Sequence, residues 1–137
     1  MTSLSAALLI GQAGHEAPKR ATRVLRGFPA WLHPALNAAY PEEVAKRFGK
    51  PIRSDWAAGV LLCALNDASG CAPFDHVGHD ADENLISEPY AATCATCQAA
   101  ASEFARRLGV RFTVSEQTYH APGVAVRFTF SKPGVRR

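Results

Sequence analysis

The hydrophobic pattern of this chain is clearest between residues 93 and 109. Apolar side chains recur there at helical spacing and would form one buried face: Cys97, Ala101, Phe104, Ala105 and Leu108. Thr93 is suited to cap the N-terminus of this helix, and Gly109 is suited to end it. The sequence therefore predicts an amphipathic helix that covers part of a core.

Two segments after this helix alternate apolar and polar residues with the period of a β-strand. They span residues 110–114 and 124–130, and each places valines and phenylalanines on one face. Arg111 and Arg127 fall on the opposite face, which we expect to be solvated. The pattern predicts an antiparallel pair of strands packed against the helix, followed by a frayed tail over residues 131–137.

The first half of the chain is less regular. Residues 1–27 are a basic segment in which the pattern defines no element. Short helices are predicted over residues 32–39 and 41–49; in the second, proline and acids begin the segment and bases and glycine end it. Residues 54–65 fit either a helix capped by Ser54 or a buried strand, and both interpretations stay open.

Together these elements predict a single α+β domain over residues 1–137. The chain is 47% hydrophobic and 20% charged, and this length and composition suit a globular domain with its own core. The longest apolar run near the N-terminus, residues 6–10, is too short to span a bilayer or to act as a secretory signal. We therefore expect a cytoplasmic protein with no membrane association.

Charge is segregated along the chain, although the net charge is only +3. Residues 54–98 contain seven acidic residues and neither lysine nor arginine, whereas each flank has five more bases than acids. An acidic centre suits a bound cation, and basic flanks suit an anionic partner. The alternative is that the flanks neutralise the centre within the fold.

The cysteines and histidines around this acidic centre are candidate metal ligands. Cys94 and Cys97 lie one helical turn apart, and thiolates and imidazoles are the ligands that zinc prefers. We predict a zinc site formed by Cys71, His76, Cys94 and Cys97, with His79 as a substitute for His76. In a reducing cytosol, metal ligands are more common than disulfides. Buried core thiols and an exposed redox dithiol are the alternatives.

Residues 71–92 show little periodicity and predict a long ordered loop. A bound metal would hold such a loop in place. Cys63, by contrast, lies in an apolar run and is expected in the core. Asp80, Asp82 and Asn84 could instead bind calcium, although the loop lacks the glycine and the distal glutamate of an EF-hand.

Residues 94–114, a Cys-x2-Cys helix that runs into a strand, resemble the second half of a zinc-dependent nucleobase deaminase. That resemblance implies a catalytic zinc whose bound water is activated by a glutamate. His76 or His79 would be a ligand, and Glu83 would carry the proton. The His-x-Glu motif of those enzymes is missing from this chain, so the deaminase stays an alternative.

Two further resemblances cover fewer residues. The order of His76, Asn84 and the Cys-x2-Cys pair resembles an HNH nuclease, which implies His76 as the base that activates water. Trp56, Cys63 and the same pair resemble part of a WhiB-like iron–sulfur regulator, which would need a further cysteine after the pair.

We therefore expect a zinc-stabilised binding protein without enzymatic activity. Its expected partner is nucleic acid or a larger nucleoprotein machine, as for a phage- or plasmid-borne regulator or inhibitor; a protein partner is the other candidate. The enzyme alternative is a deaminase-like or nuclease-like hydrolase built around a catalytic zinc. Basic side chains near the predicted helix end and on the strands would contact phosphates: Arg106, Arg107, Arg111 and Arg127.

Overall fold

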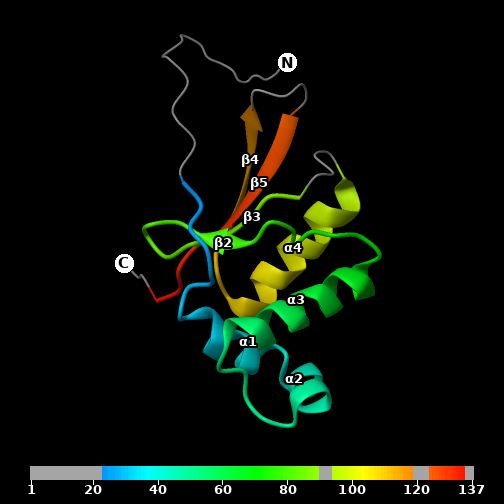
Figure 1. Cartoon of the computed structure of the whole chain (residues 1–137). Helices are drawn as coiled ribbons and strands as arrows, with labels where there is room; N and C mark the ends of the chain where they lie inside the picture. The colour runs from blue at the N-terminus through cyan, green and yellow to red at the C-terminus, as the bar shows by residue number, and fades with distance from the viewer. Residues whose placement is uncertain (1–22, 90–93, 119–123, 135–137) are drawn as a thin grey trace.

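The computed structural model describes residues 23–89, 94–118 and 124–134 (Figure 1). Within these ranges it contains four helices and a four-stranded antiparallel sheet, which confirms the predicted α+β class. Figure 1 shows α1, α2 and α3 gathered at one end of the molecule, with the strands extending from the other. Among the described residues, no helix has both the length and the apolar character that crossing a bilayer would require.

α1 (Leu32–Ala39) and α2 (Pro41–Phe48) form a short helical pair at the predicted positions. α1 buries Leu32 and Leu36, which lie one turn apart on the face that meets the core. α2 begins with proline, carries acids in its first turn and bases in its last, and ends at Gly49. Gly49 has a φ of +68°, a left-handed conformation that strains residues with a side chain, so glycine is suited to end this helix.

α3 (Asp55–Ser69) shows that the ambiguous segment is a helix, not a strand. The Ser54 hydroxyl caps it by accepting a hydrogen bond from the Ala57 backbone N–H at 3.1 Å. Its buried face consists of Ala57, Ala58, Leu61 and Leu62. The prediction that Cys63 is a core residue is wrong, because Cys63 is exposed. It follows the buried face by one residue, or about 100° of helical rotation, and so leaves the core side.

The predicted loop over residues 71–92 contains a short hairpin. β2 (Gly78–His79) pairs with β3 (Leu85–Ser87) in antiparallel register. The buried Asp80 closes the connecting turn, because its two carboxylate oxygens accept hydrogen bonds from the backbone and side-chain N–H groups of Asn84. Both Asp80 oxygens therefore accept hydrogen bonds within the turn. Asp80 and Asn84, two of the three residues in the calcium alternative, are bonded to each other. Strands this short show too few alternations for the sequence pattern to reveal them.

The sheet has the strand order β2-β3-β5-β4. β4 (Phe112–Thr118) pairs with β5 (Val124–Phe130), which confirms the predicted antiparallel pair. β5 also pairs with β3, so β5 is an interior strand with neighbours on both sides. α4 (Ala95–Leu108) packs against this sheet, with the Phe104 ring centroid 5.2 Å from that of Phe130.

The described ends of the chain are hydrogen-bonded to the sheet. Leu25 bridges His79, whereas residues 1–22 of the predicted basic segment lie outside the described residues. The Ser131 backbone N–H donates to the Arg111 carbonyl at 2.9 Å, and the Lys132 N–H donates to Asn84 Oδ1 at 2.9 Å. The prediction of a frayed tail is therefore wrong for Ser131 and Lys132; residues 135–137 lie outside the described part.

A cluster of aromatic rings joins the helices to the sheet. Phe104 of α4 lies at its centre, with ring centroids 4.6 Å from Phe74 and 6.1 Å from Tyr40. Phe104 and Tyr40 are buried, and burying such a side chain stabilises a fold by about 1.5–3 kcal/mol. The contact between Phe104 and Phe74 holds the segment after α3 against α4, the helix whose first turn carries Cys97.

Candidate metal centre

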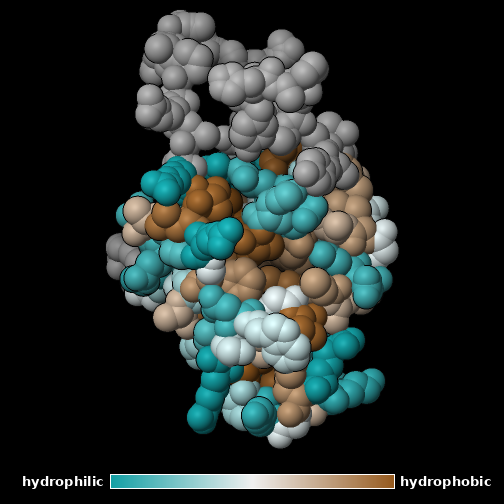
Figure 2. Space-filling model, viewed as in Figure 1, coloured by the Kyte–Doolittle hydropathy of each residue, from teal (hydrophilic) through white to brown (hydrophobic). Residues whose placement is uncertain are grey.

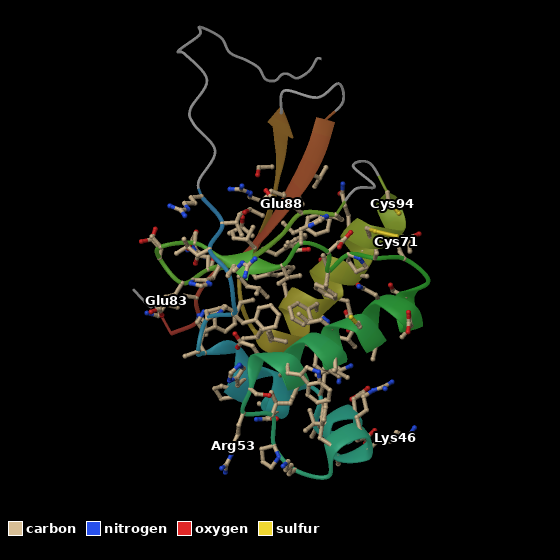
Figure 3. The ribbon with its side chains drawn as sticks, viewed as in Figure 1. Lys46, Arg53, Cys71, Glu83, Glu88 and Cys94 are labelled. Atoms are coloured by element: carbon tan, nitrogen blue, oxygen red, sulfur yellow. A yellow bond between two sulfur atoms is a disulfide. The ribbon has the colours of Figure 1, made fainter. Side chains whose placement is uncertain are left out.

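Three cysteines from two parts of the sequence meet where α3 ends and α4 begins. Cys71 follows Gly70, the C-cap of α3; Cys94 is the N-cap of α4; and Cys97 lies in its first turn. The sulfur atoms of the three residues all lie within 4.8 Å of one another, close enough to hold a metal ion. Figure 3 shows Cys71 and Cys94 side by side at this junction. We call these three residues the thiol cluster.

Cys71 is the residue that links the other two. It forms a disulfide with Cys97, and the Cα atoms of the pair are 5.9 Å apart. The Cys71 sulfur also lies 3.3 Å from the sulfur of Cys94. The expectation that these thiols avoid disulfides is therefore wrong for this state of the molecule. Core packing places Cys71 and Cys97 at a separation that suits a disulfide.

The N-terminus of α4 contributes a hydrogen-bond donor to the thiol cluster. The Cys97 backbone N–H donates to the Cys94 sulfur at 3.3 Å, in the place that a serine or aspartate oxygen takes in a common N-cap. The prediction that Thr93 caps this helix is therefore wrong, because Cys94 is the N-cap; Thr93 lies outside the described residues. One backbone N–H of the first turn of α4 is thus directed at the Cys94 sulfur.

The loop that carries Cys71 is held by side chains of the protein. Asn66 of α3 makes two hydrogen bonds with the backbone of Phe74, each 3.0 Å long. The Ser87 hydroxyl of β3 donates to the Pro73 carbonyl at 2.6 Å and accepts from the Asp75 N–H at 3.1 Å. These hydrogen bonds hold the loop without a metal ligand. The order of the loop is therefore not evidence for a bound metal, as the sequence had suggested.

The predicted histidine ligands are not part of the thiol cluster. His76 lies five residues after Cys71 on the same loop, is exposed and has a φ of +50°. His79 lies on β2, where its Nδ1 is 2.9 Å from the Gly27 carbonyl oxygen. Within the described ranges, the structure thus brings together three of the four predicted ligands, Cys71, Cys94 and Cys97, and neither histidine.

Glu83, the proton carrier of the enzyme alternative, lies far from the thiol cluster. It sits in the β2–β3 turn and forms an ion pair with Lys132 at 3.2 Å. Figure 3 shows Glu83 on the opposite side of the molecule from Cys71 and Cys94. A metal held by the cysteines would therefore have no contact with this carboxylate.

Four arginines were predicted to bind nucleic acid. The prediction that Arg127 is exposed is wrong. Its side chain is buried and pairs with Glu88, Nη2 to Oε2 at 2.7 Å. The physical reason is that β5 is an interior strand. Ser87 is registered opposite Phe128, so the next residue, Glu88, lies across from Arg127 and covers it.

The other three arginines differ in their surroundings. Arg106 is exposed and pairs with Glu103, and this hydrogen bond holds the pKa of the Glu103 carboxyl below its ordinary value. Arg107 donates to the Ala39 carbonyl at 2.7 Å and lies over the Tyr40 ring, 4.1 Å from its centroid. Arg111 is exposed on the segment before β4. Arg127 therefore shares no exposed face with the other three, whose contact with phosphates stays a prediction.

The structure also exposes a large aromatic side chain at the start of α3. Trp56 is 74% exposed, the most exposed large hydrophobic side chain of the described residues. It lines a pocket of about 480 Å³ together with Lys50 and Arg53. The signal available in the sequence was the alternation of basic and aromatic residues from Lys46 to Trp56.

The chain matches no protein-family model, no curated protein and no solved structure.

Proposed function

We propose that this chain is a cytoplasmic, zinc-stabilised binding protein without enzymatic activity that acts on nucleic acid or a nucleoprotein complex. The observation that carries the proposal is the thiol cluster, whose three sulfur atoms lie within 4.8 Å of one another. Soft thiolate ligands favour zinc over the hard cations calcium and magnesium. Bound there, zinc would hold the start of α4 against the segment that follows α3.

Zinc binding requires the reduced form of the cluster. Cys71 and Cys97 must first gain two electrons and two protons as their disulfide opens, supplied by a dithiol reductant that is itself oxidised to a disulfide. The thiols then lose their protons as they bind the ion, because the ligand is the thiolate. The disulfide form and the zinc form are therefore alternative states of the same residues, separated by a two-electron reduction.

A structural zinc site has four ligands, and the thiol cluster contributes three. We assign the fourth position to His76, because it is exposed and lies on the same loop as Cys71. The loop would have to move to bring its imidazole to the metal. Water in the fourth position would instead give the open coordination of a catalytic zinc site.

The surroundings of the cluster favour a structural role over hydrolysis. The deaminase-like and nuclease-like alternatives need a general acid or base beside the metal-bound water. Glu83 lies on the opposite side of the molecule and pairs with Lys132 (Figure 3). His79 is directed to the Gly27 carbonyl. The deaminase-like alternative would therefore need a proton carrier other than Glu83, and the nuclease-like alternative would need His76 as its base instead of as the fourth ligand.

Exposed cations support an anionic partner for this protein. Arg111 remains a candidate contact, and basic residues at the end of α2 add to it. Nucleic acid is favoured over an acidic protein because the exposed Trp56 lines a pocket with Lys50 and Arg53, and bases stack on indole rings.

The proposal is tested by zinc titration of the fully reduced protein and of the disulfide form, followed by desalting and elemental analysis. We expect one zinc per reduced chain and none on the oxidised chain. Reduced protein that retains no zinc would refute the metal part of the proposal. Equal zinc on both forms would show that the ion binds elsewhere.

A further inference from the structure

The first turn of α3 carries an indole that stays largely exposed within the described part of the chain. Trp56 is the second residue of the helix and is 74% exposed, whereas Tyr40 and Phe104 are buried in the core. Its one described ring partner is Phe48 of α2, which meets it edge-on at a centroid distance of 6.5 Å. An exposed indole lacks the stabilisation that burial gives. A partner that covers it would add the free energy of that burial to its binding free energy.

The indole borders a hollow rather than a flat surface. The pocket between the end of α2 and the start of α3 has a volume of about 480 Å³, within the range of small-molecule sites. Its apolar wall includes Phe48 and Trp56, and its polar wall includes Lys50, Arg53 and Ser54. A planar, apolar group with an attached anion would match both walls.

The charge around this pocket is positive. Four exposed cations lie within eight residues of one another along the chain: Lys46, Arg47, Lys50 and Arg53. Among the described residues, none of the four takes part in an ion pair. Figure 3 places Lys46 and Arg53 on opposite flanks of this end of the molecule, and Figure 2 shows hydrophilic surface on both flanks with paler and apolar surface between.

The carboxylate nearest to the indole in sequence, Asp55, contacts residues that do not line the pocket. Asp55 accepts a hydrogen bond from the Phe28 backbone N–H at 3.1 Å, and its other oxygen lies 2.9 Å from His33 Nε2. The acids of α2 lie in its first turn, at the opposite end of that helix from the pocket. An anion that approaches Lys50 and Arg53 therefore meets little opposing charge from these neighbours.

We propose that this pocket binds single-stranded nucleic acid, with one base stacked on Trp56 and the adjoining phosphates at Lys50 and Arg53. This inference rests on the partner part of the proposed function and names its site. A stacking partner must offer an open base face, which single strands have and duplexes conceal. An acidic peptide would neutralise the cations but would leave the indole without a planar partner.

The experiment measures binding of fluorescein-labelled ten-residue oligo(dT) and oligo(U), single-stranded and as duplexes, to reduced, zinc-loaded protein. Trp56→Ala should weaken single-strand binding about 5- to 150-fold, the range for loss of one base stack. The double variant Lys50→Gln/Arg53→Gln should flatten the log–log salt dependence by about 0.7 for each lost phosphate contact. Arg23→Gln, an exposed arginine outside the pocket, is the matched control and should bind like the parent.

Quenching of tryptophan fluorescence locates the stack directly. The chain has two tryptophans, so Trp31→Phe leaves Trp56 as the single reporter. The indole emission of this variant should fall on addition of oligo(dT). Trp56→Phe should bind more tightly than Trp56→Ala, since the phenyl ring restores part of the stack.

Several results would overturn the inference. These are parent-like binding by both pocket variants, a loss confined to the control Arg23→Gln, tighter binding of duplex than of single strands, or binding of poly-glutamate but of no oligonucleotide. Zinc content is measured on the same samples. A pocket variant that keeps its zinc and binds oligonucleotide like the parent refutes this binding site alone. A parent protein that retains no zinc refutes the metal part of the proposed function.

Discussion

Asn66 and Phe74 are joined by two hydrogen bonds, one from the Asn66 side-chain amide to the Phe74 carbonyl and one from the Phe74 N–H to Asn66 Oδ1. The Asn66 carbonyl also accepts from the Cys71 N–H at 3.3 Å. One residue of α3 thus fixes both ends of the short segment that presents Cys71. The position of that cysteine is therefore set by the fold before any metal binds.

Asn66→Ala should destabilise the protein and weaken zinc binding. The substitution removes both side-chain hydrogen bonds and leaves the Phe74 backbone groups without them, at a cost of about 1–3 kcal/mol. Urea unfolding of the reduced protein measures the loss. Asp67→Ala, at an exposed position one residue later, is the control. Equal stability of the two variants would contradict the positioning role of Asn66.

Cys94→Ser and Cys63→Ala should separate the metal ligand from the exposed thiol. Serine can still cap α4, so Cys94→Ser removes one thiolate while keeping the N-cap hydrogen bond. We expect this variant to lose zinc in native mass spectra and Cys63→Ala to keep it. Equal zinc loss in the two variants would show that the ligand set is wrong.

Arg127→Gln should be far more destabilising than Arg106→Gln. Arg127 is buried against Glu88, and its removal leaves a carboxylate without its cation, at a cost on the order of 3 kcal/mol. Arg106 pairs with Glu103 in full contact with solvent, where such pairs contribute little. Thermal unfolding of both variants provides the comparison. A larger effect at Arg106 would mean that the buried pair is misassigned.

Tyr40 should release its proton later than an ordinary tyrosine. Burial raises the pKa of Tyr40 from 10.0 to about 12, although the nearby Arg107 guanidinium lowers it. Between these values the unfolded chain loses this proton before the folded chain does, so stability should fall as the pH rises from about 10 to about 12. Tyr40→Phe should reduce this fall and remove the latest step of the phenolate absorbance titration. An unchanged titration would contradict the burial of the hydroxyl.

Local patterns in the sequence identified several of the elements. The helix over residues 41–49 and the strand over residues 124–130 were predicted because their charges, caps and alternation are set by neighbouring residues. Gly49 and Gly109 also end helices as expected. Such signals do not depend on where an element sits in the fold, and so they can be read from the chain alone.

The errors concern properties that only the tertiary structure determines. Arg127 is buried because β3, which the sequence did not reveal, pairs with β5 and brings Glu88 beside it. Trp56 and Cys63 lie in an apolar stretch, yet α3 turns both away from the core. Sequence periodicity shows which residues share a face; it does not show which face is covered.

The candidate site was predicted in part. The three cysteines were chosen from spacing and residue type, and the fold brings them together. His76 was chosen because it lies near Cys71 in the sequence, but the direction of a loop side chain depends on turns that spacing does not define. The disulfide between Cys71 and Cys97 could not be distinguished from metal ligation by sequence, since both need the same two thiols.

Zinc K-edge X-ray absorption of the reduced, zinc-loaded protein tests the central claim most directly. The account predicts three sulfur neighbours at about 2.3 Å and one nitrogen neighbour at about 2.0 Å, the distances of thiolate and imidazole ligands. Cys97→Ser should lower the number of sulfur neighbours by one or abolish zinc binding. A zinc surrounded only by oxygen and nitrogen, or by four sulfurs, would contradict the site formed by Cys71, Cys94 and Cys97.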